Sequence, residues 1–302
     1  MRYDRFEVRG SRFEVIIQQV EGSELISNLL QLKPNTFRLM DIQFYKYQGT
    51  GNDFIILDNR DGRYSEITKH QVFKLCERRF GIGADGLMML NEKPGYDFAM
   101  RYFNSDGRES SMCGNGGRCM IKFAYQLGLH RSTYKFFAAD GDHEAEIDTD
   151  GTVSLKMQDV NNVRTYHGDY ILNTGSPHYV KIVSDIMALD VVKKGREIRN
   201  SKEFEKEGIN VNFVERLEED DHILVRTYER GVEDETYSCG TGVTAAALVC
   251  FHNENGFNQV EVKTLGGNLS VEFDRVDEDH YENIWLCGPA ELVFEGNLKG
   301  IS

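Results

Sequence analysis

Two cysteines, Cys113 and Cys239, stand in near-identical surroundings far apart in the chain. The first lies in residues 111–117 (SMCGNGG) and the second in residues 237–243 (YSCGTGV), and each begins a Cys-Gly-x-Gly motif before a helix-compatible stretch. One such motif would mean little. Two of them indicate a site with matched halves, in which each half supplies a thiol. An enzyme that moves a proton on both faces of one carbon needs this arrangement.

The glycines after each cysteine explain why these motifs suit an anionic substrate. Glycine lets the backbone come close to a ligand, and a helix N-terminus offers unpaired N–H groups to a carboxylate. The same helix end favours a thiolate. A helix end contributes about 0.3–1 kcal/mol, or ~2 kcal/mol when partly buried, and one pKa unit is about 1.4 kcal/mol. We therefore expect the pKa of each thiol to be lowered by about one unit, and we expect the two thiols to titrate as a coupled pair.

The duplication extends beyond the cysteines. Tyr102 and Tyr228 each lie eleven positions before a motif cysteine, and residues 50–54 (TGNDF) resemble residues 174–178 (TGSPH). A period above 120 residues is the size of a domain and too long for a solenoid repeat. The chain is therefore predicted to hold two copies of one fold unit. His178 and Glu229 lie in duplicated segments, so we expect them to assist the thiols.

The composition favours a globular protein. The chain has 302 residues, 40% of them hydrophobic and 28% charged, which fits roughly two domains. Its formal net charge of −14 disfavours nucleic acid and acidic membrane as partners. No apolar run approaches the ~20 residues of a membrane span, and no secretory signal is visible. We expect a cytoplasmic protein that acts on a small molecule.

The other cysteines are expected to be structural. Six cysteines in the whole chain do not form a disulfide scaffold, and Cys76, Cys119, Cys250 and Cys287 lack the repeated motif. Cys113 and Cys119 have no second Cys/His pair at the spacing of a zinc site. No metal site is predicted.

Hydrophobic patterning predicts many strands and one apolar helix for each half. Helices are expected at residues 66–80, 116–127 and 242–252, and a loop at 231–235. Strands are expected at residues 42–47, 54–58, 87–90, 98–103, 144–157 (a hairpin), 223–228, 260–265, 269–273 and 290–294. This content predicts an α/β fold in which a curved mixed sheet wraps around the helix of each half. Residues 1–39 carry no duplicated signature and are expected to be an N-terminal extension or a mis-start.

Taken together, the motifs resemble the diaminopimelate epimerase family. The resemblance rests on residues 50–54, 103–107, 112–118, 175–178, 209–213, 228–231 and 238–242, and it covers the chain from about residue 41 onward. It implies two pseudo-symmetric domains, each a mainly antiparallel sheet around a central helix, with the site in the cleft between them. The expected domains are residues 41–160 plus 290–302, and residues 161–289. It also implies an epimerase that needs no cofactor, interconverts LL- and meso-2,6-diaminopimelate in lysine and peptidoglycan precursor synthesis, and forms a homodimer.

The resemblance also assigns roles to residues. Cys113 and Cys239 would be the acid/base pair, with His178 and Glu229 assisting. The expected substrate-binding residues are Asn52, Asn104, Gly114, Asn115, Asn210, Glu229, Arg230, Gly240 and Thr241. Arg230 suits a distal carboxylate, and the backbone amides after each cysteine suit the reacting one. Two positions depart from a well-known family pattern: Ser176 stands where some members have Asn, and Gly86 where some have Gln.

Two other readings compete with this one. A proline or hydroxyproline racemase would share the paired cysteines, but an open diamino diacid needs the additional polar residues Asn52, Asn210 and Arg230, and all three are present. Alternatively, Cys113 and Cys239 could form a regulatory disulfide in a binding protein.

Overall fold

The structure is a computed structural model that describes residues 40–217, 222–250 and 255–301. The predicted extension 1–39 lies outside these residues. In chain order the strands are β1 (Met40–Gly49), β2 (Asn52–Asp58), β3 (Gly86–Asn91), β4 (Phe98–Asn104), β5 (Glu109–Ser110), β6 (Thr133–Ala138), β7 (Gly141–Ile147), β8 (Val153–Lys156), β9 (Val163–Tyr166), β10 (Asp169–Asn173), β11 (Pro177–Ile182), β12 (Asn210–Arg216), β13 (His222–Glu229), β14 (Asp234–Thr236), β15 (Gly256–Thr264), β16 (Gly267–Arg275), β17 (Tyr281–Gly288) and β18 (Glu291–Ile301). The α-helices are α2 (Lys69–Cys76), α3 (Gly114–Gln126), α4 (Val191–Arg199) and α5 (Gly240–Cys250), and η1 (Ile186–Ala188) is a 3-10 helix.

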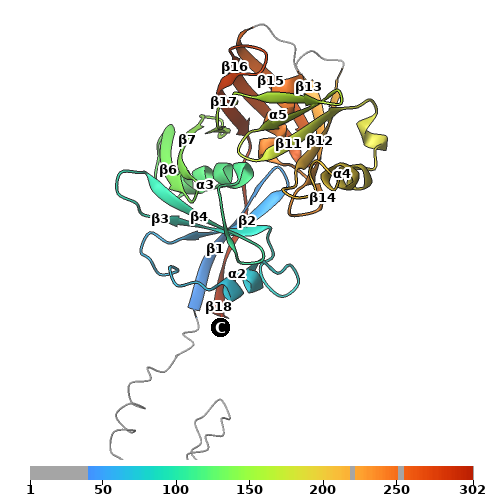
Figure 1. Ribbon diagram of the computed structural model, residues 1–302. Coiled ribbons are helices and arrows are strands. Elements are labelled where there is room, and N and C mark those ends of the chain that lie inside the picture. Colours follow the sequence, from blue (N-terminus) through green and yellow to red (C-terminus); the bar gives the residue numbers. More distant parts are fainter. Residues whose placement is uncertain (1–39, 218–221, 251–254, 302) are drawn as a thin grey trace, which may run out of the picture. The chain divides into compact units, whose positions relative to one another are not determined.

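Strand pairing shows that one topology occurs twice (Figure 1). In the first half the strands pair in the order β18-β1-β2-β3-β4-β6-β7-β8. In the second half they pair in the order β9-β10-β11-β12-β13-β15-β16-β17. In each series the third and fourth strands pair in parallel, as do the fifth and sixth, and every other pairing is antiparallel. The predicted mainly antiparallel, pseudo-symmetric α/β fold is confirmed.

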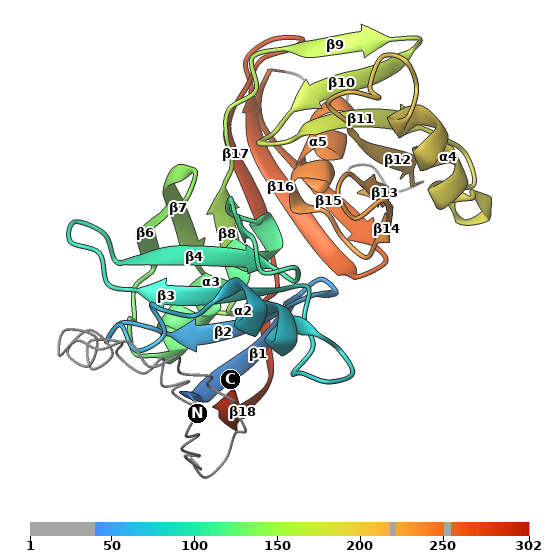
Figure 2. The same ribbon diagram turned by 60° about the horizontal axis from the view of Figure 1, so that its bottom comes forward.

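Each half wraps its sheet around one buried helix. Helix α3 contacts β1, β2, β3, β7 and β8, and α5 contacts β10 to β13 and β15 to β17. Ten of the eleven residues of α5 are buried, because its Ala- and Val-rich sequence is apolar all round. Helices α2 and α4 cover smaller apolar clusters around Leu87 and Val211. The two series join where β8 pairs with β17 (Figure 2).

Several predicted boundaries are wrong, for identifiable reasons. The helix expected at 66–80 is only Lys69–Cys76, because Thr68 and Gln71 form a capping box at its start and Glu77 leaves the helical conformation. The loop expected at 231–235 contains the start of β14. The last strand extends to Ile301 because it pairs along β1. The helix expected to reach residue 252 is described to Cys250, and the two residues beyond lie outside the described residues.

The predicted equivalence of Tyr102 and Tyr228 is also wrong. Tyr102 pairs with Ser110, and Thr227 pairs with Thr236. Ser110 and Thr236 each stand three positions before a motif cysteine, so the true counterpart of Tyr102 is Thr227. The hairpin between β13 and β14 is one residue longer than the hairpin between β4 and β5. A shift of one residue places a side chain on the opposite face of its strand.

Candidate active site

The two cysteine motifs meet at the starts of α3 and α5. Cys113 is the N-cap residue of α3, and Cys239 immediately precedes α5. A Cβ atom added to Gly114 would lie 3.6 Å from the Cα of Gly240, so the first turns of the two helices are in van der Waals contact. The predicted matched halves are therefore brought together. A Cβ atom would press on the Leu286 Cδ2 atom at both positions, at 3.2 Å from Gly114 and 2.9 Å from Gly240, so glycine suits both.

Side-chain hydrogen bonds also join the two motifs. The Nδ2 of Asn115 donates to the carbonyl oxygen of Ser238 at 3.0 Å. On its other side the Oδ1 of Asn115 accepts from the guanidinium of Arg118 at 3.0 Å. Arg118 is fully buried, and it also contacts the hydroxyl of Thr50 and the carbonyl of Gly114. Sequence reasoning did not single out Arg118, since surface arginines have the same signature as a buried one.

Both motif thiols are free and partly buried. Burial raises the pKa of Cys113 above its usual value, and the Glu229 carboxylate adds to the rise. Burial raises the pKa of Cys239 to about 12, again with a contribution from Glu229. Backbone hydrogen bonds from Gly116 and Gly242 act in the opposite direction but are weaker. The expected lowering of the thiol pKa is therefore wrong, because desolvation outweighs the helix end.

Asn52 has an oriented side chain beside Cys113. The Cys113 thiol donates to its Oδ1 at 3.6 Å, and Asn115 Nδ2 donates to the same oxygen at 3.4 Å. Asn52 Nδ2 donates to the carboxylate of Asp85 at 2.6 Å, and Arg78 bridges Asp85 and Asp53. Asp85 therefore keeps the amide oxygen turned toward the thiol. Asp85 lies in a glycine-rich stretch, and its role could not be inferred from that context.

Glu229 lies near both thiols at the end of β13. Its Oε2 accepts a hydrogen bond from the Thr236 hydroxyl at 2.9 Å. Burial raises its pKa, and Asp85 contributes to the rise. A buried carboxylate with one hydrogen bond gains from a nearby cation. This environment suits the ammonium group of an amino acid.

His178 is a fully buried residue of β11. Burial, and secondarily the charge of Arg230, lower its pKa to about 3, so the imidazole is neutral at physiological pH. Its Nδ1 lies 3.0 Å from the Nδ2 of Asn212. Its Nε2 is buried and has no hydrogen-bond partner among the described residues.

Asn210 and Arg230 form a second polar group. Asn210 Oδ1 accepts from the backbone N–H of Arg230 at 2.8 Å, and its Nδ2 donates to Ser176 Oγ at 2.9 Å and to the carbonyl of Pro177 at 3.1 Å. The Arg230 guanidinium donates to the carbonyl of Glu207 at 3.1 Å and reaches Ser176 Oγ at 3.5 Å. Asn210 and Ser176 thus position the exposed Arg230.

Of the remaining predicted residues, Thr241 lies beside Cys239 and Asn104 lies on the protein surface. Thr241 Oγ1 lies 3.5 Å from the sulfur of Cys239, and its carbonyl accepts from Thr174. Asn104 is exposed at the end of β4, where its backbone N–H donates to the carbonyl of Arg108.

The space over Gly86 is filled by the ring of Tyr102. A Cβ atom at Gly86 would lie 2.4 Å from the Cε2 of Tyr102. Burial, followed by the charges of Cys113, Asp85 and Glu229, raises the pKa of Tyr102, so it is a neutral phenol beside the thiol. Tyr102 thus shares the surroundings of Cys113, and sequence analysis had used it only as a marker of duplication.

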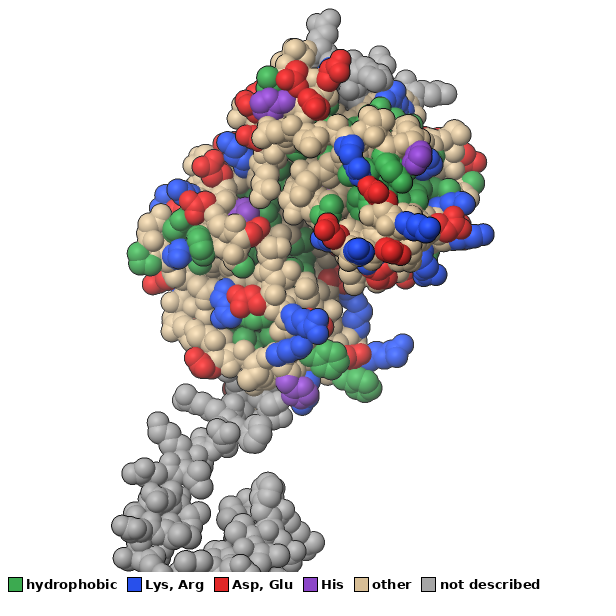
Figure 3. Space-filling model, in the orientation of Figure 1, with side chains coloured by type: hydrophobic (Ala, Val, Ile, Leu, Met, Phe, Trp, Pro, Cys, Tyr) green, Lys and Arg blue, Asp and Glu red, His purple; other side chains and the backbone are tan. Residues whose placement is uncertain are grey.

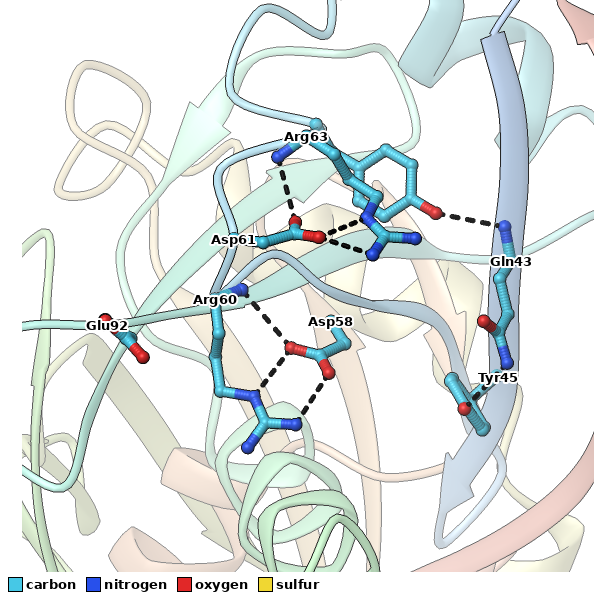
Figure 4. Close-up of a pocket in the computed structure, with 8 residues that line it drawn as sticks. Gln43, Tyr45, Asp58, Arg60, Asp61, Arg63 and Glu92 are labelled. Atoms are coloured by element: carbon cyan, nitrogen blue, oxygen red, sulfur yellow. Dashed lines mark hydrogen bonds and ion pairs between the residues drawn. The ribbon is translucent and has the colours of Figure 1, made fainter.

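A separate hollow of about 360 Å³ is lined by residues of β1, β2 and the following turn, and it contains none of the predicted site residues (Figure 4). Its arginines are already paired: Arg60 donates to Asp58 at 2.9 and 2.8 Å, and Arg63 pairs with Asp61. These short-range pairs neutralise the guanidinium groups, and Glu92 adds a further carboxylate, so the lining offers no free cation to an anionic ligand.

Two further observations bear on the type of site. Among the described residues, no group of three or more His, Cys, Asp and Glu side chains could hold a metal ion. Nor does this part of the chain contain a helix with the length and hydrophobicity needed to span a bilayer. On the face drawn in Figure 3, acidic and basic side chains are interspersed.

Comparisons with known proteins identify the family of the chain. The chain matches the family model described as diaminopimelate epimerase over residues 44–163 and 170–293. It is 45% identical over 258 residues to a diaminopimelate epimerase of Flavobacterium psychrophilum, covering 85% of this chain and 100% of the relative. It is 41% identical over 260 residues to a diaminopimelate epimerase of Chlorobaculum tepidum, covering 83% and 98%.

Solved structures share the fold at low sequence identity. A PhzF-family phenazine biosynthesis protein of Bacillus anthracis has a TM-score of 0.67 at 16% identity, covering 86% of this chain and 99% of that one. A hydroxyproline epimerase of Agrobacterium vitis has a TM-score of 0.62 at 11% identity, covering 87% and 93%. Such distant similarity shows only the fold, whereas the family match and the close relatives establish descent. The chain belongs to the diaminopimelate epimerase family.

Proposed function

We propose that the protein is a cofactor-independent two-base epimerase that interconverts LL- and meso-2,6-diaminopimelate for lysine and peptidoglycan precursor synthesis. The observation that supports it best is the contact between the starts of α3 and α5, each with a cysteine at its first turn. This contact puts two thiols and two sets of helix N–H groups at one place. Family membership supports the same substrate.

Binding would begin at the helix ends. The backbone amides in the first turns of α3 and α5 would hold the carboxylate next to the reacting carbon. The same donors would stabilise the negative charge that develops on that carboxylate as the α-proton leaves. Arg230, held by Asn210 and Ser176, would bind the distal carboxylate.

The substrate would also help ionise a thiol. Glu229 raises the pKa of both cysteines, so an ammonium group beside Glu229 would compensate its charge and favour a thiolate. One sulfur would then remove the α-proton as a thiolate, and the other would deliver its own proton to the opposite face. The products are the inverted carbon, a new thiol and a new thiolate, so atoms and charge balance. By the family stereochemistry, Cys113 would act on the LL isomer.

The biological setting is part of this proposal. We infer a cytoplasmic homodimer that acts on a small amino acid and binds neither nucleic acid nor membrane. We also propose a division into two domains, residues 41–160 plus 290–302 and residues 161–289.

The test is α-proton exchange in deuterated water, followed by NMR under reducing conditions with no cofactor added. Purified protein is given LL-diaminopimelate and, separately, L-proline. Exchange and epimerisation of diaminopimelate alone support the proposal, and Cys113→Ser and Cys239→Ser should each abolish epimerisation. Exchange with proline alone would indicate a proline or hydroxyproline racemase instead. If neither compound exchanged its α-proton, the remaining alternative would be a binding protein in which Cys113 and Cys239 form a regulatory disulfide.

A further inference from the structure

A line of buried polar groups connects β13, β12 and β11 beneath the start of α5. The hydroxyl of Thr227 donates to Asn212 Oδ1 at 2.9 Å. Asn212 Nδ2 in turn lies 3.0 Å from His178 Nδ1 and 3.2 Å from the carbonyl oxygen of Tyr179. Thr227, Asn212 and His178 are all buried. Buried polar groups of this kind have few alternative partners, so their donor and acceptor roles can be deduced.

The carbonyl of Tyr179 determines which way the Asn212 amide points. A backbone carbonyl can only accept, so the atom of Asn212 beside it must be the Nδ2 donor. The opposite orientation would place an amide oxygen against that carbonyl at 3.2 Å. The amide oxygen therefore faces Thr227. The same Nδ2 group faces His178, so Nδ1 of the imidazole must be an acceptor that carries no proton.

The acceptor role of Nδ1 determines which ring nitrogen of His178 carries the proton. A neutral imidazole carries one proton, and with Nδ1 as acceptor that proton is on Nε2. Nε2 is buried and has no partner among the described residues. A buried N–H without a partner lowers the stability of the folded protein by about 1–3 kcal/mol. Such a cost is expected where an N–H is kept available for a ligand.

The surroundings of His178 indicate what that ligand is. Asn212 packs under the first turn of α5: a Cβ atom at Gly242 would lie 2.2 Å from Asn212 Oδ1 and 3.4 Å from the Cβ of Cys239. The charge of Arg230 also acts on His178. The free N–H therefore belongs to the region where α5 and Arg230 attract negative charge, so an anion bound there is the acceptor that we expect for it.

We propose that Asn212 is a positioning residue that holds His178 as the Nε2–H tautomer, so that His178 serves as a hydrogen-bond donor to the anion at the start of α5 and not as a base. The role in turnover rests on the proposed function. The anion is either the Cys239 thiolate or the reacting carboxylate. Asn212 does not touch the substrate, and it acts through His178.

The first arm of the test uses the full-length protein without substrate. With ¹⁵N-labelled histidine, the His178 signals are assigned among the eight histidines by comparison with His178→Gln. We expect a protonated Nε2 and an unprotonated Nδ1 in the wild type. A proton on Nδ1 would overturn the proposal. This NMR measurement requires neither a variant at Asn212 nor catalytic activity.

The second arm uses Asn212→Asp, which has the same shape but only accepts hydrogen bonds. Its carboxylate should draw a proton onto Nδ1, changing the ¹⁵N signature and lowering kcat by roughly 10- to 100-fold with little change in KM. Thr227→Val is the matched control, since it removes the hydroxyl and leaves the amide donor; it should keep the wild-type tautomer. An Asn212→Asp protein with wild-type tautomer and kcat would contradict the assignment.

The recipient is identified by repeating the NMR measurement with Cys239→Ser and with a non-reacting dicarboxylate amino acid. A change of the Nε2–H signal only on ligand addition indicates the carboxylate, and a change only in the variant indicates the sulfur. If Nε2–H is present but diaminopimelate is not turned over, the proposed function fails while the tautomer assignment stands.

Discussion

The side-chain amide of Asn115 donates a hydrogen bond to the backbone carbonyl oxygen of Ser238 at 3.0 Å, and so ties the first turn of α3 to the residue before Cys239. Asn115 is buried, at 1% exposure. This bond links the two cysteine motifs directly. It therefore contributes to the relative placement of the two thiols.

Replacing Asn115 by Ala should damage both stability and turnover. The change leaves the Ser238 carbonyl and the Arg118 guanidinium each without a partner they have in the wild type. We expect the free energy of unfolding to fall by about 1–3 kcal/mol and kcat/KM to fall at least roughly 10-fold. Urea unfolding and the epimerisation assay measure both. Asn161→Ala, at an exposed site, should behave as the wild type; an Asn115→Ala protein with unchanged kcat/KM would contradict the role of this bond.

Asp85→Ala should lower activity with little effect on stability. Asp85 fixes the amide of Asn52 at 2.6 Å, and without it Asn52 can turn its Nδ2 toward Cys113. Because the Asp85 and Arg78 side chains are 43% and 58% exposed, the loss of their ion pair should cost less than about 1 kcal/mol. We expect kcat to drop by roughly 10-fold. Asp61→Ala removes a comparable exposed ion pair away from the thiols, and equal kcat values for the two variants would refute this explanation.

Gly266→Ala should destabilise the contact between the two halves. A Cβ atom there would lie 1.8 Å from the carbonyl oxygen of Thr50, a distance at which the backbone must shift. We expect a loss of more than about 2 kcal/mol in the free energy of unfolding, measured by urea denaturation. Leu265→Ala, at the exposed neighbouring position, should cost far less. Similar midpoints for the two variants would show that the contact is not rigid.

The stability should fall between pH 6.5 and 4.5 because of His178. Burial lowers its pKa from 6.5 to about 3, so in this interval the unfolded chain binds a proton that the folded protein does not. By linkage the free energy of unfolding decreases as the pH falls, and this residue accounts for about 2–3 kcal/mol at pH 4.5. The raised pKa of Glu229 acts in the opposite direction.

The comparison of wild type with His178→Gln separates the two effects. The variant should lose less stability over the same interval, as measured by urea unfolding at each pH. The lowered pKa of Asp53, about 2, affects stability only below pH 3.8 and does not interfere. Parallel pH profiles for the two proteins would show that His178 titrates normally.

Mild oxidation should join Cys113 to Cys239 and abolish activity. The adjoining glycines of the two motifs lie close together, so we expect the two thiols to come within reach of a disulfide. Mass spectrometry should find this bridge, and a reductant should restore turnover. The four buried cysteines serve as internal controls and should stay reduced. Full activity with both thiols bridged would rule out the two-base mechanism.

The sequence was sufficient to predict the parts that depend on local motifs. The Cys-Gly-x-Gly repeats predicted two helix starts at one site, and the strand patterns predicted the doubled α/β fold. The lowered thiol pKa was mispredicted because desolvation depends on the folded environment of Cys113 and Cys239. The partners Asp85 and Asn212 were missed because their importance comes from contacts between distant strands.

The pairing of β1 with β18 has a consequence for synthesis on the ribosome. Strand β1 (Met40–Gly49) pairs with β2 on one side and with β18 (Glu291–Ile301) on the other. Because β18 is at the C-terminal end, β1 has only one of its two partner strands until nearly the whole chain has been translated. During that interval one edge of β1 is open, and an open edge can pair with another nascent chain. Protection of this edge by a chaperone would have to last until β18 emerges.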